Sequence, residues 1–132
     1  KISSGACAIV TGKQKSLHLG NLSLQRDWGW APEYVEAMAR MLTLKEPTDF
    51  IIATGQINQL EDFVRQAFIE VELDWKKCVV IDKQFFRLNE GSHPSADIVH
   101  TTQHLGWKAT TTMHGVVKKM IDACQIHMKE CE

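Results

Sequence analysis

Apolar residues recur at every third or fourth position in several parts of the chain, the spacing that places them on one face of an α-helix. This pattern predicts long helices over residues 1–11, 32–44 and 58–71, a last helix beginning near residue 112, and a shorter one around residues 96–104. The apolar stripes of the four long helices are formed by Ile2, Ala6, Ile9 and Val10, by Val35, Met38, Ala39 and Leu42, by Leu60, Phe63, Val64, Ala67, Phe68 and Val71, and by Met113, Val116, Val117, Met120, Ile121 and Cys124.

The ends of these helices carry residues that favour a helix start or stop. Gly12 is a stop signal for the first helix. Pro32 and Glu33 suit the first turn of the second helix, where a fixed φ and a negative charge are favourable. Asn58 can cap the third helix, with Glu61 at the reciprocal position of a capping box. The sequence therefore predicts a helix start near residue 31 and another at Asn58.

Shorter apolar runs predict strands between the helices. The unbroken run Phe50–Ala53 is typical of a strand buried on both faces of a parallel sheet, and Cys78–Ile81 predicts a second short strand. Alternating leucines around the turn pair Gly20-Asn21 indicate extended segments on both sides of it. The fold class is α/β, with helices packed on a small, incomplete sheet.

A sheet of one or two strands leaves backbone amides and hydrocarbon without partners. We therefore expect the missing strands to come from another part of the same parent protein or from a partner chain. The first helix begins without a cap or an initiator methionine, which favours the hypothesis that these 132 residues are a piece of a longer polypeptide. Without the missing part, two apolar stripes should remain partly exposed. One contains Val35, Met38 and Leu42, and the other contains Phe63 and Phe68.

Composition and charge narrow the function classes. The chain is 44% hydrophobic, enough for a core, and its net charge of −1 comes from mixed positive and negative residues. No basic run or apolar segment of spanning length is present, so we expect no binding to nucleic acid or membrane and a location in the cytoplasm.

The four cysteines do not form a metal-binding or redox motif. No C-x-x-C pair occurs among Cys7, Cys78, Cys124 and Cys131. They are spread through predicted helices and strands, which predicts buried, reduced thiols. On one helix, Cys124 and Cys131 would be separated by about 10 Å, beyond disulfide reach.

One stretch combines charge, aromatic rings and a helix start. Arg26, Asp27 and Trp28 lie on a loop just before the second predicted helix. A guanidinium beside a helix N-terminus favours an anion. The alternative is an exposed Arg26 that merely neutralises Asp27, because such surface pairs are common and weak.

Several motifs together resemble the C-terminal portion of the GDP-mannose 4,6-dehydratases, and the resemblance covers essentially the whole chain. They are Leu19-Gly20-Asn21, Arg26-Asp27-Trp28-Gly29, Tyr34-Val35-Glu36-Ala37-Met38, Glu46-Pro47, Asp49-Phe50, Ile52-Ala53-Thr54-Gly55, Ile81-Asp82, Phe86-Arg87, Glu90 and Leu105-Gly106-Trp107-Lys108. These enzymes belong to the extended short-chain dehydrogenases, which have a Rossmann-type fold.

The resemblance implies a parent with an NADP-binding Rossmann half and a substrate-binding half, with residues 1–132 forming part of the latter. Such an enzyme, a lyase, oxidises C4 of GDP-mannose by hydride transfer to NADP, loses water across C5 and C6, and returns the hydride to C6. The product, GDP-4-keto-6-deoxymannose, leads to GDP-fucose. The resemblance further implies that the complete protein forms a homo-oligomer.

The resemblance also assigns roles to three residues. Arg26 and Arg87 would bind the diphosphate, and Glu90 would accept hydrogen bonds from the ribose hydroxyls, which agrees with the chemistry of forked guanidiniums and carboxylates. No catalytic residue is expected in this chain, because its only tyrosine, Tyr34, is followed four positions later by Met38 instead of lysine. No Gly-x-x-Gly-x-x-Gly phosphate loop occurs among the eight glycines.

The chain departs from the family at some of these positions. Residues 87–92 read Arg-Leu-Asn-Glu-Gly-Ser, where the family usually has Arg-Pro-x-Glu-Val-Asp. The family also usually has an acidic residue at the position of Ser23 and an aspartate at the position of Glu33. These departures leave open a noncatalytic module: a truncated or degenerate relative that binds a nucleotide sugar, or one that binds a full-length dehydratase where its own Rossmann half should lie.

Two further interpretations concern histidines and aromatic residues. The pairs His100/His104 and Cys124/His127 are spaced for metal binding, but two ligands bind weakly and the solvent-facing interpretation is favoured. Trp28, Trp30, Phe85 and Phe86 could stack on guanine, although packing in the core is the favoured interpretation. Trp107 is interpreted as a packing residue.

Overall fold

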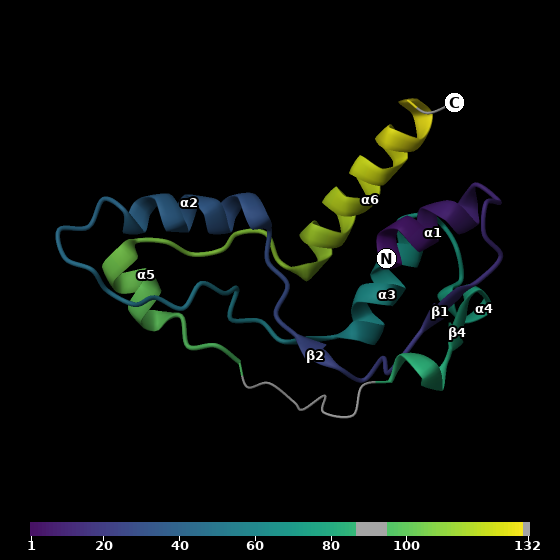
Figure 1. The fold of residues 1–132 in the computed structure, drawn as a ribbon, viewed down its shortest axis with the longest axis horizontal. Helices are drawn as coiled ribbons and strands as arrows, with labels where there is room; N and C mark the ends of the chain where they lie inside the picture. Colours follow the sequence, from purple (N-terminus) through teal and green to yellow (C-terminus); the bar gives the residue numbers. More distant parts are fainter. Residues whose placement is uncertain (87–94, 131–132) are drawn as a thin grey trace.

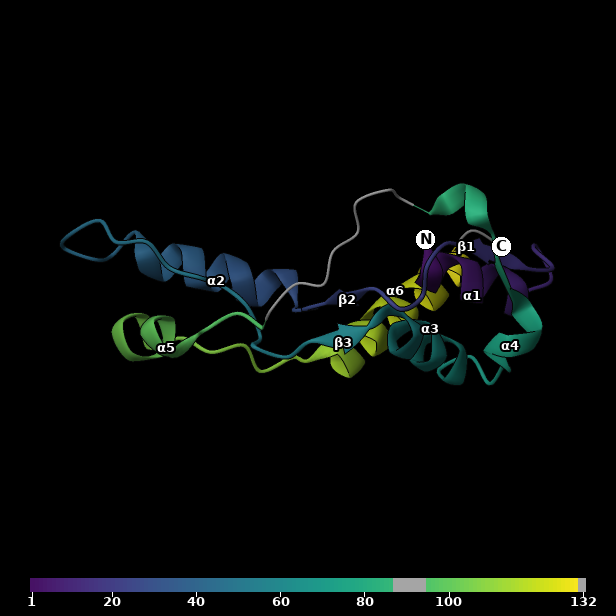
Figure 2. The ribbon, with the colours of Figure 1, turned by 90° about the horizontal axis from the view of Figure 1, so that it is seen from below.

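The computed structural model describes residues 1–86 and 95–130, and the side chains of residues 128–130 are not considered. The elements are α1 (Ile2–Val10), β1 (Leu17–Leu19), β2 (Gln25–Arg26), α2 (Ala31–Met41), β3 (Asn58–Gln59), α3 (Leu60–Ile69), α4 (Trp75–Cys78), β4 (Val79–Ile81), η1 (Lys83–Phe85), α5 (Val99–Leu105) and α6 (Met113–Glu130). Figures 1 and 2 show an elongated arrangement, with α1, α3 and α6 grouped at one end and α2 and α5 at the other.

The larger core lies between α1, α3 and α6. Phe68, Val64, Val117 and Cys7 are completely enclosed there, and the Leu17 and Leu19 side chains of β1 pack against them. The apolar stripes predicted for α1, α3 and α6 supply this core, except that Val10 and Met120 are exposed.

A second, smaller core joins α2 to α5. Ala37, Leu105 and Trp107 are buried in it, and the rings of Tyr34 and Trp107 meet edge to face with centroids 5.8 Å apart. The packing role predicted for Trp107 is confirmed. Gly106 ends α5 with φ of 61°, a left-handed conformation that glycine adopts without steric cost.

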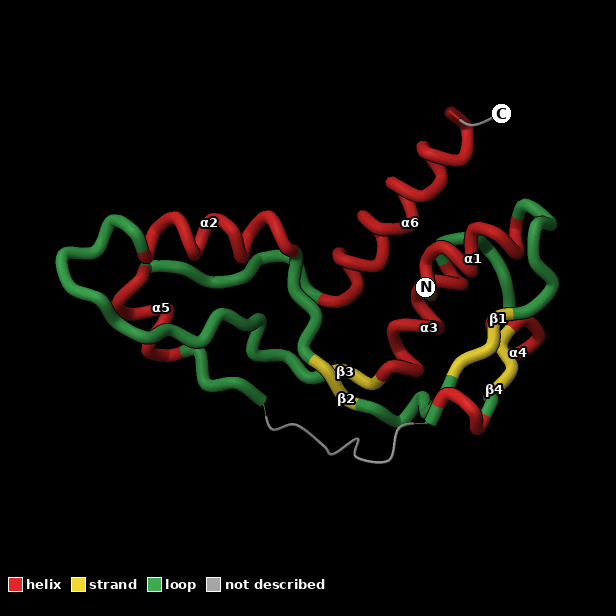
Figure 3. The backbone as a smooth tube through the Cα atoms, viewed as in Figure 1, coloured by secondary structure: helices red, strands yellow, loops and turns green. Residues whose placement is uncertain are grey.

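The strands are few and short, as Figure 3 shows. β1 and β4 form a parallel pair, with Leu17 opposite Val79 and Leu19 opposite Ile81, while β2 and β3 form an antiparallel pair. The strand predicted near Cys78–Ile81 is therefore confirmed, and so is the expectation of helices with a small sheet.

The strand predicted at Phe50–Ala53 is wrong. This segment has no strand alongside it in the described part of the chain, and Ile51 is 56% exposed. Its backbone is instead bonded to a side chain of α5: the Thr101 hydroxyl donates to the Ile51 carbonyl at 2.7 Å. An apolar run becomes a strand only where a neighbouring strand completes its hydrogen bonds.

The capping box predicted at Asn58 is also wrong. The residue at the N-cap position of α3 is Gln59, which makes no side-chain capping bond. The first amides of the helix are satisfied from a distant part of the sequence: Leu60 N donates to the Leu24 carbonyl at 2.7 Å and Glu61 N to the Leu22 carbonyl at 3.0 Å. These bonds anchor the segment before β2 to the start of α3.

Exposure of the α2 stripe agrees with expectation, whereas exposure of the α3 stripe does not. Val35, Met38 and Leu42 are 62%, 56% and 88% exposed. Phe63 and Phe68 are buried, because α1 and α6 cover the face of α3 that was expected to need a further sheet.

The three cysteines among the described residues are free thiols. The predicted burial holds for Cys7, whereas Cys78 and Cys124 are only half-buried. Desolvation by burial, reinforced by a hydrogen bond with Cys124, raises the pKa of Cys7 to about 12. Cys131 lies outside the described residues. No helix in residues 1–86 and 95–130 combines the length and apolar character needed to span a membrane.

Glu33 joins the start of α2 to the segment before α6. Its carboxylate accepts bonds from the backbone N–H groups of Thr110 and Thr111, at 2.9 and 3.1 Å, and from both their hydroxyls, at 2.7 and 2.5 Å. Desolvation raises the pKa of Glu33, but the hydrogen bonds from Thr111 and Thr110 outweigh it and lower the pKa from 4.5 to about 2.

A pH-dependent contribution to stability follows from this lowered pKa. The ionised Glu33 stabilises the fold fully above about pH 4.5, and this contribution is lost as the pH falls towards about 2. We expect Glu33→Gln to lower the free energy of unfolding at pH 7 by about 1–2 kcal/mol and to make stability less dependent on pH between 4.5 and 2. Urea unfolding across this pH range measures both effects. Glu36→Gln is the control, and a Glu33→Gln curve parallel to wild type would contradict the assignment.

Candidate functional site

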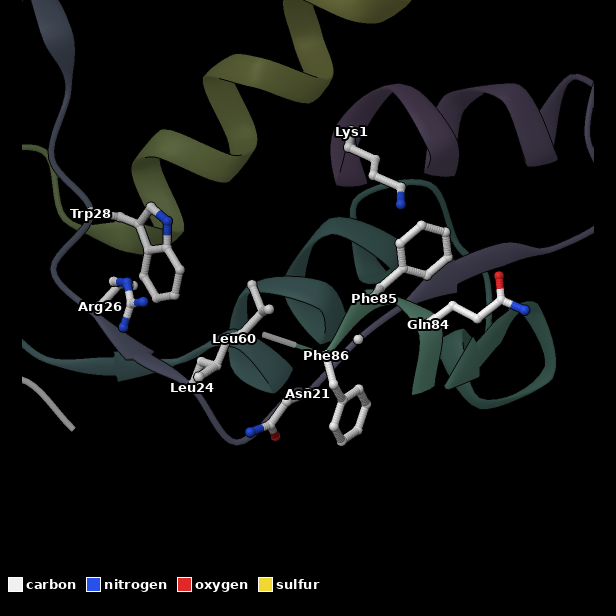
Figure 4. Close-up of a pocket in the computed structure, with 10 residues that line it drawn as sticks. Lys1, Asn21, Leu24, Arg26, Trp28, Leu60, Gln84, Phe85 and Phe86 are labelled. Atoms are coloured by element: carbon white, nitrogen blue, oxygen red, sulfur yellow. The ribbon is translucent and has the colours of Figure 1, made fainter. Parts of the chain in front are cut away.

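A cavity of about 510 Å³ lies between the segment containing β2 and the segment containing η1 (Figure 4). This volume is within the range of small-molecule sites in proteins. It is lined by Lys1, Gly20, Asn21, Leu24, Arg26, Trp28, Leu60, Gln84, Phe85 and Phe86. The lining thus combines two cationic side chains with three aromatic rings.

One wall of the cavity comes from the extended chain around β2. Leu24, Arg26 and Trp28 all line the cavity, and they are two residues apart, as expected where side chains of an extended segment alternate between two faces. Trp28 also packs against the core: its ring centroid lies 5.2 Å from that of Phe63. The packing interpretation of Trp28 is therefore confirmed, although the same ring also faces the cavity.

Asp27 points away from the cavity lining. Its Oδ1 accepts from the N–H and hydroxyl of Thr54, at 3.1 and 2.6 Å, and its Oδ2 accepts from Gly55 N at 2.8 Å. Sequence reasoning missed this role, although the alternation at residues 24, 26 and 28 would have placed Asp27 on the opposite face.

Arg26 is half-buried, and its Nη1 donates to the Gln25 carbonyl at 2.7 Å. No ion pair of Arg26 with a carboxylate occurs in residues 1–86 and 95–130. The alternative in which Arg26 neutralises Asp27 is therefore wrong, because the Asp27 carboxylate is taken by Thr54 and Gly55. The remaining guanidinium donors can serve an anion in the cavity.

The opposite wall is aromatic. Phe85 and Phe86 are 48% and 46% exposed and line the cavity, so the expectation that they pack in the core is wrong. The Nζ of Lys1 lies 4.1 Å from the centroid of the Phe85 ring, within the range of a cation–π contact. Trp30 is outside this lining; its half-buried ring lies 5.5 Å from Lys119 Nζ.

Backbone contacts hold η1 against the turn at Gly20. Asp82 N donates to the Leu19 carbonyl at 2.8 Å, and Asp82 Oδ1 caps η1 by accepting from Gln84 N at 2.9 Å. Gly20 faces the Phe85 carbonyl so closely that a Cβ atom there would lie 2.5 Å from that oxygen. A glycine is therefore required where the two walls meet.

Two of the three residues to which the sequence assigned ligand binding, Arg87 and Glu90, lie outside the described residues. They follow Phe86 in the sequence, the last described residue before the gap and part of the cavity lining. Their roles remain predictions. Arg26 is the one predicted binding residue that can be placed, and it lines the cavity.

The histidine pair on α5 is at the other end of the molecule. The rings of His100 and His104 stack with centroids 4.3 Å apart, and the Phe50 ring lies tilted against His100 with centroids 5.2 Å apart. In the described part of the chain, no group of three or more His, Cys, Asp or Glu residues could hold a metal ion.

Comparison with known proteins gives one family. A sequence model described as GDP-mannose 4,6 dehydratase matches residues 1–120. GDP-mannose 4,6 dehydratase 1 of Arabidopsis thaliana is 38% identical over 122 residues, which cover 92% of this chain and 34% of the relative. The human GDP-mannose 4,6 dehydratase is 33% identical over a 140-residue alignment, which covers 93% of this chain and 38% of the relative. The chain thus spans little more than a third of the length of these relatives.

Solved structures share the fold. A protein called RMD from Pseudomonas aeruginosa, solved with NADPH, matches 96% of this chain and 42% of its own length, with a TM-score of 0.81 and 18% identity. A dTDP-glucose 4,6-dehydratase from Bacillus anthracis, solved with NAD, matches 97% of this chain over 40% of its own length, with a TM-score of 0.77 and 14% identity. The arrangement of helices and short strands is therefore that of Rossmann-type dehydratases and their relatives.

Proposed function

The chain belongs to the GDP-mannose 4,6 dehydratase family, and from this membership we propose that it forms the substrate-binding part of an enzyme that converts GDP-mannose to GDP-4-keto-6-deoxymannose. The complete enzyme is a cytoplasmic, NADP-dependent lyase and a homo-oligomer on the route to GDP-fucose. The observation that carries the proposal is Arg26, which has no carboxylate partner in the described residues and lines a cavity with an aromatic wall.

The chemistry of the cavity suits a nucleotide sugar. A guanidinium offers forked, charge-assisted hydrogen bonds to diphosphate oxygens. The exposed rings of Phe85 and Phe86 offer apolar faces on which a purine can stack. Arg87 supplies a second guanidinium for the diphosphate, and Glu90 accepts hydrogen bonds from the ribose hydroxyls. The substrate is therefore held at its nucleotide end by residues of this chain.

The remainder of the enzyme supplies the reaction centre. NADP does not fit the residues of this chain, which lacks a Gly-x-x-Gly-x-x-Gly loop and has no lysine four residues after Tyr34. The Rossmann half packs on the exposed apolar face of α2, formed by Val35, Met38 and Leu42. An uncovered apolar stripe of this kind is a common mark of a contact surface.

Activity separates this proposal from a noncatalytic module. The complete protein, incubated with GDP-mannose and NADP, is expected to form a 4-keto product. Residues 1–132 alone are expected to form none, because they contain neither the tyrosine-lysine pair nor the cofactor loop. Absence of product from the complete protein would refute the proposed enzyme, and turnover by residues 1–132 alone would refute the division of roles.

A further inference from the structure

The backbone pairing at β2 is too short to fix its register firmly. β2 pairs with β3 through only Gln25 opposite Gln59 and Arg26 opposite Asn58. A slip by one residue in such a pair turns every side chain to the opposite face. At β2, that slip would turn Arg26 away from the cavity and bring the Asp27 carboxylate into it.

The segment is anchored differently at its two ends. Before β2, the carbonyls of Leu22 and Leu24 accept from the first amides of α3. After β2, the anchor is Asp27, whose two carboxylate oxygens accept three hydrogen bonds from Thr54 and Gly55. Arg26 and Trp28, the cavity-lining residues, flank Asp27 on either side. Asp27 is therefore the side-chain anchor that lies between these two residues.

We propose that Asp27 is a positioning residue that locks the register of residues 24–28, so that Arg26 and Trp28 face the ligand cavity. The proposal rests on the proposed function in so far as the ligand is a GDP-sugar. Asp27 acts through its neighbours and does not line the cavity itself.

The contacts around Thr54 indicate that Asp27 fixes the register of residues 24–28 and does not merely stabilise a local turn. Thr54 is 7% exposed, lies outside the cavity lining and is 27 positions from Asp27 in the sequence. Its hydroxyl donates to Asp27 and accepts from Gln56 N at 3.1 Å. The Gly55 carbonyl in turn accepts from the Ser95 hydroxyl at 2.9 Å. Asp27 is thus bound to a segment that is tied in turn to Ser95, 40 positions further along the chain.

The test uses variants of the complete protein. In Asp27→Asn, an amide NH₂ replaces one of the two oxygens that accept from Thr54 and Gly55. We expect GDP-mannose binding to weaken by about tenfold and NADP binding to stay unchanged. Thr54→Val replaces the hydroxyl by a methyl group and should weaken GDP-mannose binding by roughly threefold, whereas Thr54→Ser keeps the hydroxyl and should bind as wild type. Asp74→Asn, at the N-cap of α4 outside the cavity lining, is the control.

Hydrogen exchange provides a readout that needs no ligand. Backbone amides of residues 24–28 should exchange faster in Asp27→Asn and Thr54→Val than in wild type, while those of α6 do not change. Unchanged affinity for GDP-mannose in both variants, or an equal loss for NADP, would overturn the proposal. If wild type binds no GDP-mannose, the proposed function fails. Exchange then decides the lock separately: faster exchange at residues 24–28 supports it, and unchanged exchange overturns it.

Discussion

Replacement of Arg26 by alanine in the complete protein is expected to weaken GDP-mannose binding by about tenfold to a hundredfold, with NADP binding nearly unchanged. Charge-assisted hydrogen bonds contribute roughly 1.5–3 kcal/mol each, so loss of one or two of them gives a change of this size. Arg26→Lys should lose less than Arg26→Ala, because lysine keeps the charge but not the planar fork. Titration calorimetry with both ligands measures these differences.

The matched control for this experiment is Arg65→Ala. Arg65 is an arginine on α3 outside the cavity lining, paired with Asp62 at 2.5 Å in an exposed position. Its removal should leave the affinities for GDP-mannose and NADP unchanged, because Arg65 does not line the cavity. It should also cost little stability, because an exposed pair contributes at most about 1 kcal/mol. Equal, small losses for GDP-mannose and NADP in Arg26→Ala would remove Arg26 from the site.

Substitution of Gly20 by alanine is expected to disturb the cavity from the other side. The added Cβ would lie 2.5 Å from the Phe85 carbonyl oxygen, a backbone atom that can yield only if η1 moves. We expect the free energy of unfolding to fall by about 1–3 kcal/mol, as for other overpacked sites. GDP-mannose binding should weaken as well, because Phe85 and Phe86 shift with η1. Urea unfolding and calorimetry measure the two effects.

Gly12→Ala separates the clash from the general cost of replacing a glycine. Gly12 has φ of 72°, and no described atom would lie within 4 Å of a Cβ added there, so its substitution strains the backbone without touching a neighbour. This variant should lose stability yet bind GDP-mannose as wild type. Wild-type affinity in Gly20→Ala would show that η1 does not form a wall of the binding site.

The helices could be predicted from the sequence because their apolar stripes depend on local spacing. The stripe of α3 (Phe63, Val64, Ala67 and Phe68) forms the core as predicted. What the stripe does not reveal is the partner that covers it: α1 and α6 bury Phe63 and Phe68, whereas Val35 and Leu42 of α2 stay exposed. Coverage depends on distant parts of the chain, which a local pattern does not contain.

The errors have the same physical origin. Phe50–Ala53 has the apolar character of a strand but no neighbouring strand in the described residues, and the amides of α3 that Asn58 was expected to cap are taken by the carbonyls of Leu22 and Leu24. In both cases, the outcome depended on hydrogen bonds with residues distant in sequence, which a local pattern does not contain.

The candidate site could be predicted in part. The motif around Arg26 identified a residue that lines the cavity, because a family motif carries spatial information that composition lacks. Stacking of Phe85 and Phe86 on a guanine was considered, but packing in the core was favoured, since aromatic residues beside a strand pack more often than they face a ligand; both rings are exposed. The lock at Asp27 depends on Thr54, 27 positions away, and is not readable from spacing.

A crystal structure of the complete protein with GDP-mannose bound would show whether this cavity is the substrate site. The diphosphate is expected in the cavity between β2 and η1, with its oxygens about 2.7–2.9 Å from the Arg26 guanidinium nitrogens. The guanine is expected beside the Phe85 and Phe86 rings. A nucleotide sugar bound elsewhere in the protein, with Arg26 making no contact to phosphate, would contradict this assignment.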